Sequence, residues 1–419
     1  MKALSVATLT LVGDWQIQVE AEGVSQTVTI DMPNTAQIKA EPLSALPVYN
    51  PEGAEYARGM PLAGVRAQEC SVRYALHPES LVLKSATTLV AYVRGQDYEI
   101  EPTWGCVGRL TDGAIAEGMT VLATYTYGLM GLDSVVLTAD RKIVLRNGTP
   151  HVANPTPPVL ADDEIRLANI WVTAQLPKLS EENLFPVLET THPEPAISAF
   201  IPLTKAIPKT MTKLNAGGKV RIMAWGDSVT DGTFLPDYAV NRWQEQFARR
   251  LRTRYPKAEI ILMTEAWGGR NTDSYRAEPP GSLHNYQENV LALKPDLIIS
   301  EFVNDAGLDE AGVYQRYGKI RDEFQVIGAE WILITPHYVR TDWMGLTSEK
   351  NIDEDPRAYV QALRKFATEN NLAVAEGSLR YGRLWRQGIP YSTLMLNNIN
   401  HPNAFGMGLF ADALMALFP

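Results

Sequence analysis

The chain contains 419 residues, of which 45% are hydrophobic and 21% are charged, and its formal net charge is −10 at pH 7. This length exceeds the roughly 100–200 residues of a usual domain, so we expect two domains. The acidic balance argues against a nucleic-acid partner, because phosphate binding depends on clustered Lys and Arg. No stretch of the sequence approaches the ~18 apolar residues of a bilayer-spanning helix, so no membrane span is expected.

The start of the chain superficially resembles a signal peptide, because Met1-Lys2 is followed by the mostly apolar residues 3–13. A clear small-x-small cleavage site is lacking, and the alternation of apolar and polar residues continues through Trp15, Ile17 and Val19. Alternation of this kind is typical of a half-buried strand. We therefore expect a strand at the start of the chain.

Residues 1–160 carry short alternating segments separated by turn signals such as Asn147-Gly148, and helical periodicity is nearly absent. Such a pattern predicts an all-β domain, and its spacing suits a sandwich or a small barrel equally. The expected strands are 15–19, 27–30, 88–93, 120–126, 134–137 and 143–145. Cys70 and Cys106 lie in this region and have no metal-ligand spacing, so one disulfide or two buried thiols are both open.

Residues 161–218 are punctuated by prolines and end at Gly217-Gly218. Proline fixes φ and cannot donate to a strand ladder, so we expect an extended connector with short strand-like pieces such as 167–172. From Lys219 the pattern changes to alternating strands and helices. Buried strands are expected at 220–225, 260–263, 297–302, 331–335 and 372–375. Alternating βα units imply that residues 219–419 form an α/β domain with a five-stranded parallel sheet flanked by helices.

A serine follows the first of these strands, in the run Gly226-Asp227-Ser228-Val229-Thr230-Asp231-Gly232. A hydroxyl at the carboxyl end of a parallel strand faces the crevice where ligands bind, and the next turn offers N–H groups for developing negative charge. By itself, a Gly-Asp-Ser turn is more often only a turn. A serine nucleophile needs a base, and His401, in the loop before the last helix, is the candidate.

Three later runs follow this serine in order: Gly268-Gly269-Arg270-Asn271-Thr272, Phe302-Val303-Asn304-Asp305 and Asn398-Ile399-Asn400-His401-Pro402. Together the four runs resemble the Ser, Gly, Asn and His blocks of the SGNH, or GDSL-type, hydrolase family over about residues 219–419. The resemblance implies a flavodoxin-like fold and a serine esterase without metal or organic cofactor. It also implies Ser228 as nucleophile, His401 as base, and an oxyanion hole of the Ser228 N–H, the Gly269 N–H and the Asn304 amide.

One position departs from the family pattern. The family carries Asp three residues before its histidine, where Asn398 stands in this chain. The Asn398 oxygen could accept a hydrogen bond from Nδ1–H of His401 and select the tautomer, but it brings no countercharge. The alternatives are a carboxylate from elsewhere, a backbone carbonyl, a slow enzyme, or a binding protein that has lost activity.

The resemblance leaves the substrate open, because the family includes carbohydrate deacetylases, lipases, arylesterases and thioesterases. The form of the second block, the β-rich accessory domain and the aromatic residues near the blocks favour a carbohydrate ester, with acetyl as the acyl group. The residues expected to bind substrate are Asp227, Arg270, Trp267, Tyr275 and His337. The alternatives are a lipase, arylesterase or thioesterase of the same family, and a non-catalytic glycan-binding surface protein with a decayed hydrolase fold. A secreted, periplasmic or cell-surface protein is favoured over a cytoplasmic one.

Overall fold

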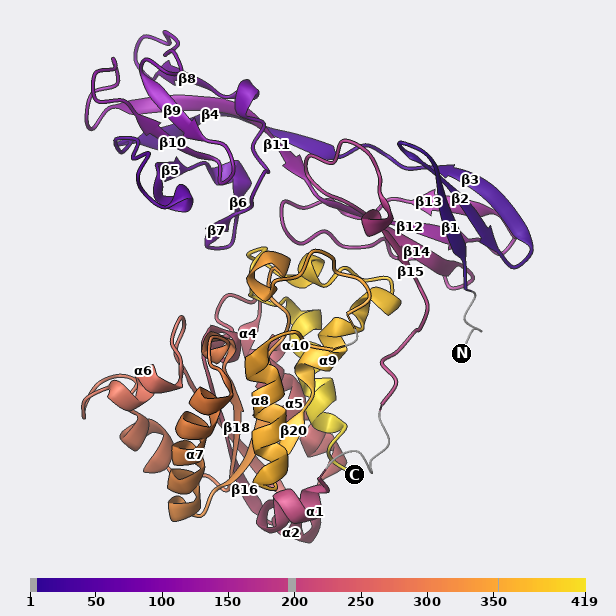
Figure 1. The fold of residues 1–419 in the computed structure, drawn as a ribbon, viewed down its shortest axis with the longest axis vertical. Coiled ribbons are helices and arrows are strands. Elements are labelled where there is room, and N and C mark those ends of the chain that lie inside the picture. Colours follow the sequence, from indigo (N-terminus) through magenta and orange to yellow (C-terminus); the bar gives the residue numbers. More distant parts are fainter. Residues whose placement is uncertain (1–5, 195–200, 353) are drawn as a thin grey trace. The chain divides into compact units, whose positions relative to one another are not determined.

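The computed structural model describes residues 6–194, 201–352 and 354–419. The chain divides into two compact units (Figure 1). Unit 1 comprises Met1–Thr190 and Trp385–Ile399, and unit 2 comprises Thr191–Leu384 and Asn400–Pro419. The chain therefore returns to unit 1 for a short second segment, which nothing in the local sequence pattern indicated.

Unit 1 is built from antiparallel sheets, which confirms the all-β prediction. The sheets have the orders β1-β2-β3, β4-β11-β8, β5-β10-β9, β13-β12-β14-β15 and β6-β7. Their strands are β1 (Thr8–Gly13), β2 (Gln16–Ala21), β3 (Val24–Thr29), β4 (Asn34–Ser44), β5 (Met60–Pro61), β6 (Arg66–Ala67), β7 (Cys70–Ser71), β8 (Val82–Ser85), β9 (Tyr98–Glu101), β10 (Cys106–Arg109), β11 (Thr120–Leu129), β12 (Gly131–Leu137), β13 (Ile143–Arg146), β14 (Ile165–Val172) and β15 (Leu184–Pro186).

Two apolar cores lie in unit 1. One gathers side chains of β4 and β8–β11, with Leu83, Val107 and Tyr125 almost completely buried. The other joins β2 and β3 to β12–β15, with Ile17 and Ile170 at its centre. In β11 the buried residues occur at every second position over most of the strand, as expected when successive side chains point to opposite faces of a sheet. The alternation that predicted β11 is therefore the alternation that buries its side chains in the core.

The strand expected at 88–93 is wrong. The strand of this hairpin is β8, and residues 86–88 form the turn that follows it. The returning segment touches the ladder through a single bridge between Ala91 and Lys84, and its side chains Leu89, Val90 and Val93 are exposed. β-branched residues are common in strands, but here they have no core to cover, so their composition misled the prediction.

The region expected to be a connector, 161–218, is mostly folded. Two strands, β14 and β15, complete the second core of unit 1. In unit 2 the helices α1 (Leu203–Ala206) and α2 (Pro208–Ala216) precede the parallel sheet. Prolines therefore separate elements of both units in this region, instead of marking one extended segment.

The segment Trp385–Ile399 is tied to the strands of unit 1 by hydrogen bonds. The Asn169 side chain donates from Nδ2 to the Gly388 carbonyl at 2.6 Å, and its Oδ1 accepts from Ser134 Oγ at 2.6 Å. Asn169 and Ser134 are completely buried. The Leu188 N–H donates to the Arg386 carbonyl at 2.6 Å. Buried polar groups held in this way resist displacement, because breaking one bond leaves its partner unsatisfied.

Both cysteines lie in unit 1. Cys70 begins β7 and is half-buried, whereas Cys106 begins β10 and is buried. The structure holds both as thiols and not as a disulfide, which decides between the two alternatives that the sequence left open. Burial raises the pKa of the Cys106 thiol to about 11, so this side chain behaves as a small apolar residue.

Unit 2 contains the expected five-stranded sheet, in which all neighbouring strands are parallel. Its strands are β16 (Lys219–Gly226), β17 (Glu259–Ala266), β18 (Leu297–Glu301), β19 (Glu330–Ile334) and β20 (Ala373–Ala375). Their order in space is β17-β16-β18-β19-β20, which is the 2-1-3-4-5 order of flavodoxin-like folds. In this topology ligands bind where the strand order reverses, outside the carboxyl ends of β16 and β18.

Helices cover the sheet of unit 2 (Figure 1). The helices that follow β16 are α3 (Ser228–Asp231), α4 (Tyr238–Asn241), α5 (Trp243–Arg254), α6 (Thr272–Ala277), α7 (Glu310–Ile327), α8 (Ala358–Glu369), α9 (Gly377–Gly382) and α10 (Ala404–Met415). The helices α7 and α8 bury Met223 and Trp225 of β16 in one core, while Ile222 and Ala224 of the same strand are equally buried. Successive residues of a strand point to opposite faces, so the sheet is covered on both sides.

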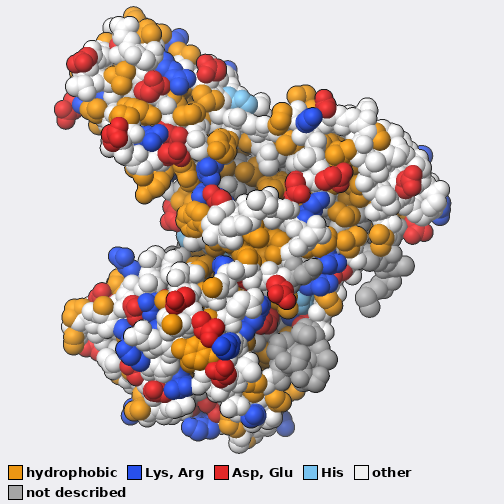
Figure 2. Space-filling view, viewed as in Figure 1, with side chains coloured by type: hydrophobic (Ala, Val, Ile, Leu, Met, Phe, Trp, Pro, Cys, Tyr) orange, Lys and Arg blue, Asp and Glu red, His pale blue; other side chains and the backbone are white. Residues whose placement is uncertain are grey.

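The surface gives two further facts. Across the part of the chain that the structure describes, no helix combines the length and the apolar character that crossing a bilayer requires. On the face drawn in Figure 2, acidic and basic side chains are interspersed among apolar and uncharged ones. Interspersed charges differ from the clustered basic field that binds phosphate backbones.

Candidate active site

Ser228 is the first residue of α3 and lies directly past the end of β16. Asp227 caps this short helix, because its Oδ1 accepts a hydrogen bond from the Val229 N–H at 3.0 Å. The turn is tight at Gly226, where a Cβ would lie 2.4 Å from the Glu301 carbonyl oxygen of the neighbouring strand. Ser228 is half-buried between completely buried neighbours, so the turn presents its hydroxyl at the edge of the sheet.

His401 meets this serine. The distance between His401 Nε2 and Ser228 Oγ is 3.2 Å, which lets the hydroxyl donate to the ring nitrogen. The histidine lies just before α10, a helix that Asn403 caps by accepting from the Gly406 N–H at 2.9 Å. Only 6% of His401 is exposed. The half-buried Phe234 stacks on the imidazole, with ring centroids 4.1 Å apart and planes inclined by 3°.

Asn304 follows β18 in the short turn Val303–Asp305 and is exposed. Asp227 holds it twice, because Oδ2 accepts from the Asn304 N–H at 2.9 Å and from Nδ2 at 3.0 Å. An amide nitrogen carries two hydrogens, so one remains to donate to a ligand. The carboxylate of the first block therefore orients the amide of the third block.

Two carboxyl groups, Asp227 and Glu301, are completely buried beneath the site. Burial raises the pKa of Asp227 to about 7, against the opposing effect of the N–H groups of Asn304 and Val229. Burial also raises the pKa of Glu301 well above its usual range; the nearby Asp227 adds to this and Arg357 opposes it. Two buried carboxylates repel each other. We assign the proton to Glu301, whose carboxyl oxygens have no hydrogen-bond partner among the described residues.

The glycine block follows β17. A Cβ on Gly268 would lie 3.7 Å from Ser228 Cβ, so this loop passes beside the serine. Gly269 is exposed and has a φ of +71°, in the left-handed region that favours glycine. The Thr272 hydroxyl donates to Asp305 Oδ2 at 2.8 Å, and both side chains are buried. The glycine and asparagine blocks are thus linked by Asp305, just as the serine and asparagine blocks are linked by Asp227.

Three of the five residues expected to bind substrate are buried, so the expectation of direct substrate contact is corrected for these three. Asp227, Tyr275 and His337 are each 0% exposed. The Tyr275 hydroxyl donates to the Gly226 carbonyl at 3.1 Å, which supports the turn before Ser228. His337 Nε2 lies 2.8 Å from the carbonyl oxygen of Asn400, the residue that precedes His401. These three side chains therefore support the site from behind.

The other two remain available to a ligand. Arg270 is exposed and its guanidinium lies 5.1 Å from the ring centroid of the half-buried Trp267. His284 stacks on the same indole at 4.8 Å, and its Nδ1 lies 2.7 Å from Glu265. The sequence analysis missed His284, Glu265 and also Phe234. Only Glu265 had a usable signal, a charged residue near the carboxyl end of a buried strand.

Asn398 lies in unit 1, where its φ is +57° and its N–H donates to the Met395 carbonyl at 3.0 Å. Asparagine tolerates the left-handed conformation better than most residues, which gives a local structural reason for an asparagine at this position. Its role toward His401 stays a prediction.

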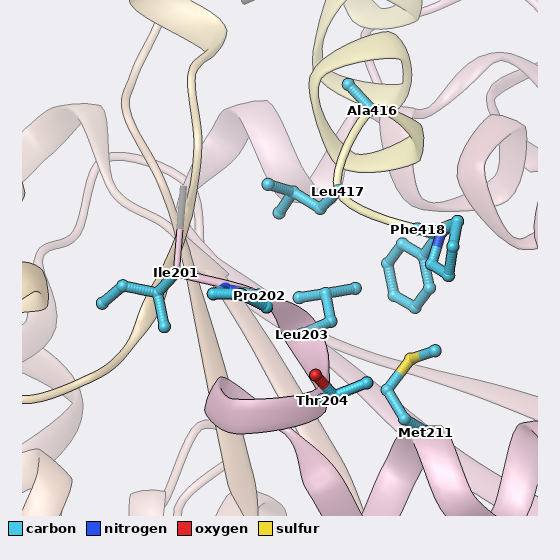
Figure 3. Close-up of a pocket in the computed structure, with 9 residues that line it drawn as sticks. Ile201, Pro202, Leu203, Thr204, Met211, Ala416, Leu417 and Phe418 are labelled. Atoms are coloured by element: carbon cyan, nitrogen blue, oxygen red, sulfur yellow. The ribbon is translucent and has the colours of Figure 1, made fainter. Parts of the chain in front are cut away.

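A separate apolar pocket of about 160 Å³ lies in unit 2 between the α1–α2 region and the chain after α10 (Figure 3). Leu203, Met211 and Phe418 are among the side chains that line it. No residue of the four blocks contributes to its lining. This pocket is therefore distinct from the site around Ser228.

Comparison with known proteins identifies the class of this domain. Residues 224–409 match the model of the GDSL-like Lipase/Acylhydrolase family, so the chain contains a GDSL-like lipase/acylhydrolase domain. No curated protein matches the chain.

Similar solved structures include two esterases that act on carbohydrates. A two-domain esterase (CEX) active on acetylated mannans has 18% identity and a TM-score of 0.42, and the match covers 52% of this chain and 54% of that one. The chain thus matches about half the length of that protein. A variant of Axe2, an acetyl xylan esterase from Geobacillus stearothermophilus, has 18% identity and a TM-score of 0.36, with 48% and 94% of the two chains covered.

Proposed function

We propose that this protein is a serine esterase that works through an acyl-enzyme intermediate, with Ser228 as nucleophile and His401 as base. The observation that supports this most directly is the 3.2 Å distance between His401 Nε2 and Ser228 Oγ at the carboxyl end of β16. A serine hydroxyl in contact with a neutral imidazole can transfer its proton as the oxygen attacks an ester carbonyl.

The attack creates a negative charge on the former carbonyl oxygen, which needs hydrogen-bond donors. The Ser228 N–H is in the first turn of α3, where N–H groups lack acceptors within the helix. The Gly269 N–H and the remaining Asn304 Nδ2–H complete the proposed oxyanion hole. Asp227 contributes by fixing the Asn304 amide before substrate binds, so no reorganisation is needed during the reaction.

The intermediate collapses when the imidazolium of His401 gives its proton to the leaving alcohol, which leaves an acyl group on Ser228. A water molecule then loses a proton to His401 and attacks the acyl carbonyl. This second step releases the acid and restores the serine hydroxyl. His401 carries the proton in both steps, and water is the second reactant.

For the substrate we propose a carbohydrate ester, with acetyl or another short acyl group. The supporting observation is the stack of Arg270, Trp267 and His284 at the carboxyl end of β17, since flat side chains with polar edges suit sugar rings. Lipase activity is the main alternative within the family, together with arylesterase and thioesterase activity.

The test has two parts. The first measures hydrolysis of an aryl acetate and then identifies the serine that an organophosphate modifies, by mass spectrometry of peptides. We expect Ser228 to be labelled and activity to fall in step with labelling. A Ser282→Ala variant is the matched control, because this half-buried serine of unit 2 belongs to none of the blocks. Full labelling with unchanged turnover would contradict the proposal.

The second part measures acetate released from a panel of acetylated polysaccharides, with aryl esters of long fatty acids as comparison. Faster turnover of the long-chain esters than of every polysaccharide would favour the lipase alternative. Failure to hydrolyse any ester, with Ser228 unlabelled, would favour the non-catalytic glycan-binding alternative.

A further inference from the structure

The ring of Phe234 lies flat against the ring of His401, with centroids 4.1 Å apart and planes within 3° of parallel. The same imidazole contacts Ser228 through its Nε2 atom. Both aromatic residues belong to unit 2. The Phe234 ring thus covers one face of the His401 imidazole, while the Nε2 atom at the edge of the imidazole contacts Ser228.

The segment that presents Ser228 also presents Phe234. Gly232 closes α3 in the left-handed conformation, with a φ of +61°, and its N–H donates to the Ser228 carbonyl at 2.8 Å. The Leu235 N–H then donates to the Gly232 carbonyl at 3.0 Å, and the Leu235 side chain is 4% exposed. Phe234 is therefore held from both sides, by a hydrogen-bonded turn before it and a buried leucine after it.

During attack the proton of Ser228 passes to His401, so the imidazole becomes a cation. A cation near the face of an aromatic ring is attracted by the negative electrostatic potential of that face. In the family pattern an aspartate would provide a countercharge, and this chain has the neutral Asn398 in its place. We propose that Phe234 is a positioning residue that fixes the plane of His401 and stabilises its cationic form. This inference rests on the proposed function.

Other charged or titratable groups near the histidine have their own partners. Asp227, which caps α3, accepts from Asn304, and Asp231 at the end of α3 accepts from the Thr233 hydroxyl. After β19, burial lowers the pKa of His337 to about 3, so that ring is neutral. Behind it, Arg357 pairs with Asp355 at 2.6 Å. The first turn of α10, residues 404–407, contains no charged residue. The Phe234 ring, whose centroid lies 4.1 Å from that of His401, is therefore placed to stabilise the positive charge of the imidazolium.

The decisive variant is Phe234→Leu, which keeps an apolar side chain and removes the aromatic face. With an aryl acetate we expect kcat to fall about 3- to 10-fold while KM changes less than about twofold. The imidazolium becomes less stable, so the acidic limb of the kcat/KM profile should move to lower pH by about 0.5–1 unit. A side chain that only packed against the site would not move this limb.

Two variants serve as controls. Phe234→Trp keeps an aromatic face and should restore the acidic limb to within about 0.3 pH unit of the parent. Phe405→Leu makes the same substitution on the 51%-exposed phenylalanine of α10 and should leave both kcat and the profile unchanged. If Phe234→Leu left the limb in place, or moved it to higher pH as exposure to water would, the inference would be wrong.

An NMR titration of the histidine rings measures the same effect without turnover. The His401 resonance is assigned by its loss in His401→Ala, and its midpoint should fall by about 0.5–1 pH unit in Phe234→Leu. This separates the two proposals. A protein without esterase activity but with the expected NMR shift would contradict only the proposed function, whereas an active esterase without the shift would contradict only the role of Phe234.

Discussion

Strands of unit 1 such as β11 pair antiparallel with their neighbours, whereas all neighbouring strands in the sheet of unit 2 are parallel. Neighbouring antiparallel strands run in opposite directions, so their carboxyl ends lie at opposite ends of the sheet. The carboxyl ends of parallel strands all lie at the same end. Residues that follow β16, β17 and β18 therefore gather in one place, although they are far apart in the sequence. The topology of unit 2 therefore brings together the residues of the proposed active site.

Unit 1 is also connected to the proposed site along the chain, because it includes Trp385–Ile399, the segment that leads directly to Asn400 and His401. Hydrogen bonds from Asn169 and Leu188 hold this segment to the strands of unit 1. The chain therefore enters the histidine block from an anchored segment. Substitutions at four positions, with successively smaller expected effects, test whether residues of unit 1 contribute to the reaction proposed for unit 2.

Ser228→Ala should lower kcat on an aryl acetate by more than ~10³-fold, because it removes the proposed nucleophile. The half-buried hydroxyl contributes little to packing, so the melting temperature should stay within a few degrees of the parent. Steady-state kinetics and thermal unfolding check both statements. A variant with near-parental turnover would move the chemistry away from this site.

Asn304→Ala should lower kcat by about 10²–10³-fold, with a smaller effect on KM, because the proposed oxyanion donor acts in the transition state. The variant also leaves Asp227 with fewer hydrogen bonds. An effect confined to KM would show instead that Asn304 binds the ground-state substrate. Kinetics with a matched Asn271→Ala variant, which removes the cap of α6, separates this role from loss of local structure.

Asn169→Leu should lower kcat about tenfold and leave KM almost unchanged, although Asn169 lies in unit 1. The substitution removes the donor to Gly388 and the acceptor for Ser134, and we expect it to cost about 1–3 kcal/mol in stability. Asn183→Leu is the control, because this buried asparagine of unit 1 instead donates to the Trp171 carbonyl at 2.8 Å. Equal effects of both variants on kcat would mean that the anchored segment does not position His401.

Asn398→Asp should change kcat by less than about tenfold, and Asn398→Ala should be mild, because we expect another group to contact Nδ1 of His401. The asparagine also has a local role, since it occupies a left-handed position with its N–H bonded to Met395. Parallel kinetics of the two variants is the measurement. A gain of several orders of magnitude in Asn398→Asp would identify a weakened triad.

Much of the architecture was predictable from the sequence. Runs of buried residues located all five strands of unit 2, because local periodicity reflects which faces of an element are covered. Alternation located fewer of the strands of unit 1, among them β2, β3, β11, β12 and β13, and missed others such as β4 and β10. The failure at 88–93 has the same origin: Val90 and Val93 suit a strand, but their exposure depends on whether another element packs over them. Within 161–218 the sequence indicated the strand-like piece 167–172, which belongs to β14, but it did not indicate β15, because prolines surround that strand.

Some residues of the candidate site were likewise predicted from the sequence, and others were found only in the structure. The four blocks, and with them the proposed roles of Ser228, Gly269, Asn304 and His401, came from the sequence, because each block is a local pattern of turn residues at the end of an element. The fold was needed to show that Tyr275 and His337 lie beneath the site, that Asp227 orients Asn304, and that Phe234 covers His401. It alone placed Trp385–Ile399 in unit 1. These facts depend on contacts between residues distant in the chain, which side-chain packing selects and local periodicity does not encode.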